Sequence, residues 1–529
     1  MRIHAPSPLR AFSCYNSLRR YQLKVEFSTS ATRTKRRDKW NYNTSPLLTT
    51  EDGDSAQYDV VTANDLESAE RPPRGVKMLV RDFIEDSLYN PQYGYFPKQA
   101  TIFDSADTPI DFHAMKDAVQ FQEEVAKRYT AYGSDKHAGP GKQLWHTPTE
   151  LFKPWYGRAI AQCLVSEYLL KYFPYEDFNI YEIGAGNGTL ALDILNYLKD
   201  EYPDVYERTR YNIIEISANL VNLQKRKLRP LHPCVRVFHK SIFHWTTREP
   251  APCFFLAMEV IDNFAHDAVR YDLRTFEPRQ TSVVVDKDGD FDMLYTPVTD
   301  HLISSFLDLR RQLGQQPSVS RLLQRFPSLR SVYANLPFAA NLSPPEFIPT
   351  RLLSLLRTLR AHFPRHRLLL TDFSSLPNQI PGHNAPVVQT RLRNLTVPCT
   401  TLLVQPGYFD IFFPTDFNML RNMYEYILSQ PLPTQSDSLF HDYHTPLTAS
   451  SSSSSSALGA SFFSSHHPSD RRAPMDGVAS ASGLPVGERK SSVFTHSEFL
   501  ETYGELDRTR LQNGENPMID FYKNVKFLF

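Results

Sequence analysis

The sequence predicts an α/β protein built on a doubly wound, mostly parallel sheet. Between residues 178 and 258, short apolar segments with strand character alternate with helix-like segments, as in consecutive βαβ units. The first strand-like segment leads into the glycine-rich loop Gly184-Ala-Gly-Asn-Gly188 and then into an apolar helix. Apolar residues make up 41% of the chain, which is enough for a substantial core.

Length and local composition divide the chain into segments. Its 529 residues suggest two or three structural units. We expect a transit peptide over residues 1–30, a disordered linker over 31–74, a main domain over 75–430 with an insertion at 98–143, a disordered low-complexity insertion over 431–491, and further elements of the fold over 492–529. The low-complexity segment over residues 431–491 is rich in Ser and Pro and cannot bury enough apolar surface to become ordered.

The first forty residues differ in charge from the rest of the chain. They hold ten basic residues against two acidic ones, and Ser and Thr are frequent. An Arg-rich, Ser-rich and acid-poor N-terminus is typical of a mitochondrial transit peptide, here with cleavage expected near Phe27. A basic tail that binds nucleic acid is the alternative. We therefore expect the protein in the mitochondrion, in its matrix.

Charge, cysteines and hydropathy narrow the functional class. The formal net charge is zero, so no global field favours nucleic acid. The five cysteines fall in no CxxC or Cys/His metal spacing, which predicts reduced thiols and no metal site. No run of about 18 apolar residues occurs, so the sequence predicts no membrane span. The oligomeric state stays open.

Two helices are predicted before the glycine loop. Apolar residues recur at i, i+3 and i+4 over 76–88, and Pro91 blocks continuation of that helix. A second helix is expected over 151–172, and Pro174 ends it. Aromatic residues and a glycine between these helices, at 93–96, indicate a turn.

The alternating elements follow in order. Strands are expected at Phe178–Ile183, Tyr211–Ile216, Val235–His239 and Cys253–Met258, with helices at Leu190–Leu198 and Leu220–Leu228. Beyond them we expect an antiparallel pair at Ser282–Asp286 and Phe291–Tyr295, mostly helical structure over 301–363, and strands at Leu368–Phe373 and Gly407–Phe413. The tail after residue 492 regains helix and strand character.

The glycine loop and two acidic residues predict a cofactor site. The loop contributes three glycines, Gly184, Gly186 and Gly188. They permit a sharp turn and a close backbone approach to a ligand, and the next helix offers free N–H groups. Glu182 lies just before the first glycine, and Glu215 ends the second strand, where a carboxylate can accept both ribose hydroxyls. A dehydrogenase would rather show GxGxxG, but position 189 is threonine.

Several segments resemble one family in an ordered set. Tyr181-Glu-Ile-Gly-Ala-Gly-Asn-Gly-Thr-Leu190 resembles motif I of the MidA-like methyltransferases. The segments Leu88–Phe96, Thr147–Gly157, Phe255–Asp262, Leu370–Phe373 and Gln405–Phe417 resemble further signatures of that family. The resemblance implies a class I, Rossmann-like methyltransferase with a helical N-terminal part, inserted substrate-side elements and S-adenosyl-L-methionine as cofactor.

The resemblance also implies a reaction. It points to methyl transfer to arginine of a mitochondrial protein, such as a respiratory complex I subunit, in support of complex assembly. The family's substrate loop has become Met258–Ala265 here. Methylation of RNA or of a small molecule, and a non-catalytic assembly factor that keeps the fold, therefore stay open as alternatives.

Carboxylates that follow two strands are the expected catalytic groups. Glu259 and Asp262 come after Cys253–Met258, and Asp372 ends another strand. Ligands of doubly wound sheets bind outside the carboxyl ends of the strands, and carboxylates can hold a guanidinium bidentately. Capping of nearby helices is the alternative role for all three.

Three more residues are predicted on the substrate side. Asn263 follows Asp262 directly and is expected to contact the substrate. The resemblance implies that the segment of Thr147 and Glu150 folds over the cofactor and closes the site.

Overall fold

The computed structural model describes a defined part of the chain, namely residues 58–98, 101–102, 109–133, 144–145, 147–319, 324–334, 341–377, 384–392, 395–429 and 491–529. The predicted transit peptide and nearly all of the predicted low-complexity insertion lie outside the described residues, as do residues 31–57. The rest of the predicted linker is ordered. It contains strand β1 (Asp59–Val60) and a 3-10 helix at Asn64–Leu66, so regular structure begins before the predicted boundary at residue 75.

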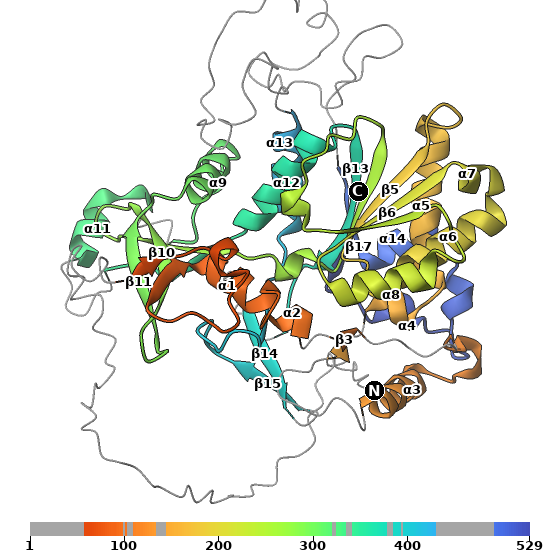
Figure 1. Cartoon of the computed structure of the whole chain (residues 1–529), viewed down its shortest axis with the longest axis horizontal. Helices are drawn as coiled ribbons and strands as arrows, with labels where there is room; N and C mark the ends of the chain where they lie inside the picture. Colours follow the sequence, from red (N-terminus) through yellow and green to blue (C-terminus); the bar gives the residue numbers. More distant parts are fainter. Residues whose placement is uncertain are drawn as a thin grey trace, which may run out of the picture. The chain divides into compact units, whose positions relative to one another are not determined.

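The main sheet has seven strands in the order β17-β18-β13-β8-β5-β6-β7 (Figure 1). Their bounds are β5 Phe178–Ile183, β6 Thr209–Glu215, β7 Val235–His239, β8 Cys253–Met258, β13 His366–Phe373, β17 Val493–Thr495 and β18 Val525–Leu528. All neighbours are parallel except the two that flank β18. The strand order reverses between β5 and β8, which confirms the predicted doubly wound sheet and creates a switch point there.

Successive side chains of each strand enter opposite layers of core. Ile180 and Leu256 face one apolar cluster, whereas Tyr181 and Phe255 face the other, as the twofold period of a strand requires. Helices α5 (Trp155–Lys171), α6 (Thr189–Glu201), α8 (Ala218–Leu228) and α14 (His496–Tyr503) contribute to the first cluster, and α9 (His301–Gln312), α12 (Thr350–His362) and α13 (Phe417–Ser429) to the second. Figure 1 shows these two groups on either side of the sheet. Helices cover both faces of the main sheet, so nearly every residue of its central strands is buried, which explains why these strands are apolar almost without interruption.

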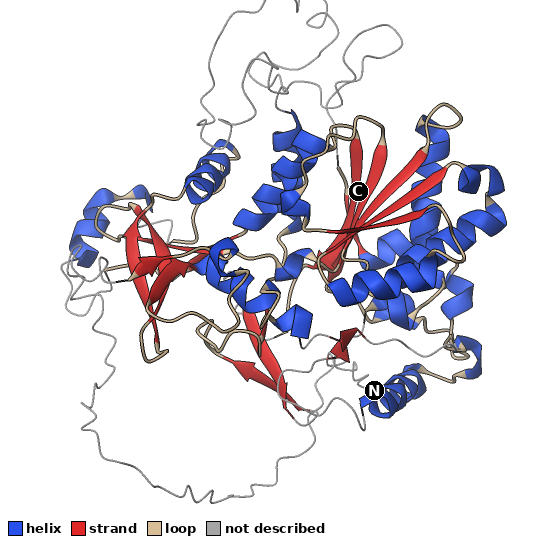
Figure 2. Ribbon diagram, in the orientation of Figure 1, coloured by secondary structure: helices blue, strands red, loops and turns tan. Residues whose placement is uncertain are grey.

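A second sheet corrects one prediction. It contains β1, β2 (Val76–Leu79), β10 (Pro278–Val285), β11 (Phe291–Pro297), β9 (Asp267–Tyr271) and β12 (Glu346–Ile348), and Figure 2 shows it apart from the main sheet. The predicted pair β10–β11 is antiparallel, as expected. The predicted helix over 76–88 is wrong in its first turn, because residues 76–79 pair with β10. Val76 and Met78 are buried at strand spacing, so cross-strand pairing overrides the helical reading of the same apolar residues.

Shorter elements complete the described chain. They are α1 (Val80–Tyr89), α2 (Tyr95–Lys98), β3 (Thr101–Ile102), α3 (Ala118–Gly133), β4 (Leu144–Trp145), α4 (Pro148–Leu151), α7 (Pro203–Glu207), α11 (Pro327–Ala334) and the three-stranded sheet β15-β14-β16 (Leu395–Cys399, Val387–Leu392, Asp410–Phe412). The predicted helix over 151–172 is divided between α4 and α5. Within the predicted insertion, Phe112 and Phe121 stack on Phe152 of the core, with ring centroids 5.8 and 5.9 Å from it.

Two of the family-like segments pack against each other at Gly407. Its φ is +84°, and a Cβ at this position would lie 1.9 Å from the carbonyl oxygen of Tyr93. Its N–H donates a hydrogen bond to the carbonyl of Ser87, at 3.1 Å. The residue therefore fixes the turn after α1 against the strand β16, and only glycine fits.

Gly407→Ala should destabilise the protein by about 3 kcal/mol or more, because backbone strain and a steric clash add at one position. Gly314→Ala is the matched control. Its φ is +67°, but a Cβ there meets nothing within 4 Å, so it should cost only about 1 kcal/mol. Chemical denaturation of both variants measures the difference, and equal losses would contradict the clash at Gly407.

Candidate active site

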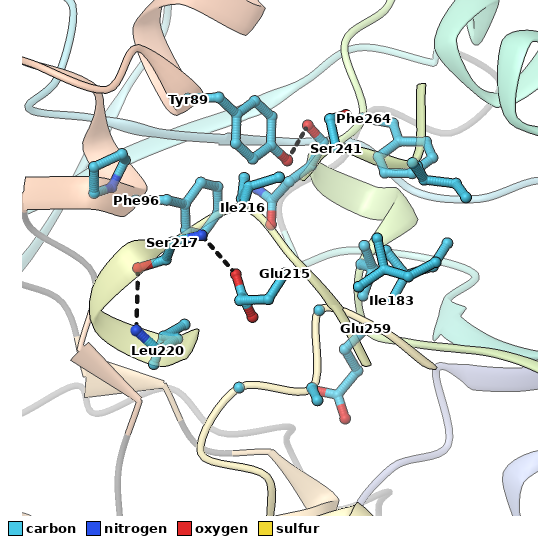
Figure 3. Close-up of a pocket in the computed structure, with 18 of the residues that line it drawn as sticks. Tyr89, Phe96, Ile183, Glu215, Ile216, Ser217, Leu220, Ser241, Glu259 and Phe264 are labelled. Atoms are coloured by element: carbon cyan, nitrogen blue, oxygen red, sulfur yellow. Dashed lines mark hydrogen bonds between the residues drawn. The ribbon is translucent and has the colours of Figure 1, made fainter. Parts of the chain in front are cut away.

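A cavity of about 680 Å³ opens at the carboxyl ends of β5, β6, β7 and β8. The glycine loop and Glu215 line one part of it, and the loop after β8 and helix α1 line another. Figure 3 shows Glu215, Glu259 and Tyr89 around this space. The cavity thus lies where the fold places ligand sites, beside the switch point of the sheet.

The glycine loop adopts a conformation that requires its glycines. Gly184, Gly186 and Gly188 have φ values of +65°, +52° and +73°, a region that costs other residues strain. A Cβ on Gly184 would lie 3.1 Å from the Val260 side chain, and one on Gly188 would lie 3.1 Å from Leu228. Gly184 therefore lets the loop approach the segment that follows β8.

Glu215 is held at the end of β6 by two donors. Its Oε1 accepts the N–H of Ser217 at 2.9 Å (Figure 3), and its Oε2 accepts from Gln224 Nε2 at 3.1 Å. Gln224 also donates to the carbonyl of Gly186, at 2.8 Å. Each carboxylate oxygen can accept more than one hydrogen bond, so Glu215 keeps acceptor capacity toward the cavity. Sequence reasoning missed Gln224, whose only signal was a polar residue on the buried face of a helix.

Gln224→Leu should weaken cofactor binding about tenfold, because it releases both Glu215 and the glycine loop. Calorimetric titration with S-adenosylmethionine measures the loss. Asn222→Leu, at an exposed position of the same helix, is the matched control and should bind normally. Equal affinity of the two variants would show that the bridge made by Gln224 does not matter for binding.

Glu182 lies in β5, two residues before the first glycine of the loop. It is buried, and its Oε2 accepts a hydrogen bond from the hydroxyl of Tyr211 at 2.7 Å. Burial raises the pKa of its carboxyl to about 7, and the nearby charge of Glu215 adds to this. The predicted cofactor residue therefore lies at the cavity, but its carboxyl is already engaged by a tyrosine of the neighbouring strand.

Glu150 and Thr147 both line the cavity. Glu150 Oε1 accepts from the hydroxyl of Thr189 at 2.7 Å and from Asn187 Nδ2 at 3.3 Å, so it holds the end of the glycine loop. Thr147 caps α4 by accepting the N–H of Glu150 at 3.3 Å. Glu150 therefore braces the cofactor loop and Thr147 caps α4, and the place of these two residues on the substrate side stays a prediction.

Glu259 is the strained residue of the site. Its φ of +53° is rare for a residue with a side chain, and its N–H donates to the carbonyl of Thr371 at 2.9 Å. The half-buried carboxyl lines the cavity. Burial, and then the charge of Asp262, raise its pKa to about 8. Asp262 lines the same cavity, and burial raises its pKa to about 7.

Asp372 caps the segment that carries Asp262. Its Oδ2 accepts the N–H groups of Ile261 and Asp262, at 2.9 and 3.0 Å, and its Oδ1 accepts that of Phe373 at 2.8 Å. The side chain is fully buried and is not among the described residues that line the cavity. The prediction of a catalytic Asp372 is therefore corrected to that of a positioning residue.

Asn263 lines the cavity, and its side-chain amide is already engaged. Its Nδ2 donates to Asp410 Oδ1 and to the carbonyl of Ile411, each at 3.0 Å, so the side chain ties the loop to β16, and its contact with a substrate stays a prediction. Asp410 is fully buried, and sequence reasoning missed it as a site residue. Its signal was the acidic residue inside the family-like segment Gln405–Phe417.

The chain belongs to a family of S-adenosyl-L-methionine-dependent methyltransferases. A family described as putative S-adenosyl-L-methionine-dependent methyltransferase matches residues 159–432, just over half of the chain. The match covers the glycine loop, Glu215, Glu259 and Asp262, and the protein is accordingly an S-adenosylmethionine-dependent methyltransferase.

Two curated proteins are similar to this chain. The mitochondrial protein arginine methyltransferase NDUFAF7 homolog of Schizosaccharomyces pombe is 27% identical over 331 residues, which are 60% of this chain and 67% of that protein. The one of Saccharomyces cerevisiae is 25% identical over 301 residues, or 52% and 67%. A solved structure of a likely methyl transferase from Burkholderia thailandensis, bound to S-adenosyl-homocysteine, is 15% identical, with 69% of this chain and 79% of that chain covered and a TM-score of 0.40.

The residues of the cavity fit this cofactor. The spare acceptor capacity of Glu215 suits the two ribose hydroxyls, and the bare backbone at Gly184 and Gly186 allows close approach of the ligand. Within the described residues, no cluster of His, Cys, Asp and Glu could hold a metal ion. In that same part of the chain, every helix is too short or too polar to cross a bilayer.

Proposed function

We propose that this methyltransferase modifies arginine of a mitochondrial protein, such as a respiratory complex I subunit, and thereby supports assembly of the complex. One observation carries the choice of acceptor: Glu259 and Asp262 line the same cavity as the cofactor loop. The names of the two curated relatives support arginine and the mitochondrion. The basic N-terminus of the chain supports import, and the resemblance to the MidA-like family supports the role in assembly.

Among the described residues, Glu259 and Asp262 form no salt bridge, and Arg351, a basic residue that also lines the cavity, is paired with Glu85. The influences that shift the pKa of Glu259 and Asp262 include no cation from the described residues. A guanidinium is planar and always charged. Its arrival would lower the pKa of both carboxyls and ionise them, and the charged pair would then hold it by short, charge-assisted hydrogen bonds.

The reaction needs alignment and a place for one proton. S-adenosylmethionine supplies a methyl group on a positively charged sulfur. In-line placement of the attacking nitrogen contributes up to roughly 7–11 kcal/mol in favourable systems. Glu259 and Asp262 provide that placement from a segment that Asp372 caps. The methylated nitrogen must then lose a proton, and the carboxylate of Glu259, ionised beside the guanidinium, is placed to accept it.

The proposal is tested in mitochondria with and without the protein. Quantitative mass spectrometry should find at least one arginine of a complex I subunit that loses methylation, and assembled complex I should decrease. Re-expression of the wild-type chain should restore both. Unchanged methylarginine, together with methylated RNA or a small molecule that depends on the protein, would redirect the function to those acceptors. Rescue of assembly by a variant without transferase activity would support a non-catalytic factor.

A further inference from the structure

Tyr89 joins the helix α1 to the segment that follows β8. It is the last residue of α1, and its hydroxyl donates to the carbonyl of Asn263 at 3.2 Å. Its ring stacks on that of Phe96, with centroids 5.2 Å apart and planes at 17°. Both rings line the cavity, and Figure 3 shows them over the space between Ser217 and Phe264.

The hydroxyl of Tyr89 lies among carboxyl groups that come from several elements. After burial, the charges that raise the pKa of this phenol are those of Asp262, Glu85, Asp410 and Asp372. The phenol therefore stays protonated and remains a hydrogen-bond donor. A cation held by Asp262 would lie close to an aromatic ring, and such rings attract cations, guanidinium in particular.

We propose that Tyr89 is a positioning residue of the acceptor side, whose hydroxyl fixes the Glu259–Asn263 segment and whose ring, with that of Phe96, forms the wall against which the acceptor side chain lies. The inference rests on the proposed arginine acceptor. Tyr89 lies before the family match over residues 159–432, and the resemblance of Leu88–Phe96 to a family signature includes this residue without assigning it a role.

The two parts of Tyr89 have separable effects. Tyr89→Phe keeps the ring and removes the hydroxyl, so kcat should fall about tenfold while KM for an arginine peptide stays within about twofold. Tyr89→Leu removes both, so KM should also rise about tenfold to thirtyfold. Phe96→Leu keeps the hydroxyl contact and should raise KM alone, by a few fold.

The experiment measures kcat and KM with an arginine peptide from the methylated protein, and the Kd of S-adenosylmethionine, for the full chain and all three variants. The Kd should stay within about twofold throughout, because Tyr89 acts on the acceptor segment. Tyr175→Leu is the matched control, since Tyr175 is 90% exposed. Should Tyr89→Leu fail to fold, Tyr89→Phe and Phe96→Leu carry the same test of hydroxyl and ring.

The experiment distinguishes a failure of the proposed function from a failure of the proposed role of Tyr89. No transfer to any arginine peptide by the wild-type protein would refute the proposed function. Transfer by the wild type, with kcat and KM unchanged in Tyr89→Phe and Phe96→Leu, would refute the role of Tyr89 alone. A loss of cofactor affinity in parallel with activity would also overturn the inference, because it would place the effect on the cofactor side or on the fold.

Discussion

Glu259→Gln should reduce methyl transfer about a hundredfold to a thousandfold while leaving the Kd of S-adenosylmethionine within about twofold of the wild-type value. Glutamine keeps the size of the side chain but can neither ionise beside a guanidinium nor accept the proton released after transfer. The backbone at this position has an unusual φ that both residues must adopt, so the fold is affected equally in both proteins.

Single-turnover rates and calorimetric titration measure the two quantities on the same preparation. Glu277→Gln, at an exposed site, is the matched control and should transfer methyl groups normally. Full activity of Glu259→Gln would eliminate the acceptor role of this carboxyl. A parallel loss of cofactor affinity would instead place Glu259 at the cofactor.

The pH profile checks the same group. A carboxyl with a raised pKa is protonated, and unable to accept a proton, below that pKa. The wild-type kcat/KM, which reports the free enzyme, should therefore rise with pH through the pKa values of about 7 for Asp262 and about 8 for Glu259. In Glu259→Gln the residual rate should lose the step near pH 8. A rate that falls across this range would contradict a carboxylate base.

Glu215→Ala should weaken S-adenosylmethionine binding about a hundredfold, a larger loss than that expected for Gln224→Leu. The substitution removes the acceptors of the ribose hydroxyls, and it also leaves the N–H of Ser217 and the amide of Gln224 without their partner. A hydrogen bond to a charged group contributes about 1.5–3 kcal/mol. Loss of the two hydrogen bonds from the ribose hydroxyls therefore accounts for the expected loss of affinity.

Titration calorimetry and thermal unfolding in the presence of the cofactor measure this effect. The wild-type Tm should rise with cofactor concentration, and that of Glu215→Ala should not. Glu207→Ala, at an exposed position just before β6, serves as the control. If Glu215→Ala bound S-adenosylmethionine with normal affinity, Glu215 would not be the residue that binds the ribose hydroxyls.

The centre of the main sheet could be predicted from the sequence because its elements are local and strongly patterned. Strands β5, β7 and β8 begin and end at the predicted residues, since each is an apolar run bounded by polar or turn residues. Residues 76–79 could not be assigned in the same way. Their partner β10 lies about two hundred residues further along the chain, and no local pattern reveals such a pairing.

The residues of the candidate site also fall into two groups, those that the local sequence predicts and those that depend on distant contacts. The glycines and Glu215 follow from spacing along one βαβ unit, and Glu259 and Asp262 from their place after β8. The roles of Asp372, Asn263 and Glu150 depend on which atoms face them in three dimensions, which spacing does not determine. Asp410 and Tyr89 lie far from the other site residues in sequence, and only the packing of β16 and α1 brings them to the same segment.

The position of β18 has a consequence for how the enzyme folds. This strand, from residues 525–528, lies between β13 and β17, and Phe527 is fully buried. A partly folded chain without β18 in place would leave one edge of β13 unpaired, next to the strand that leads into Glu259. Such an edge is prone to pairing with other chains, so folding around the acceptor segment is finished only when this distant strand is in place.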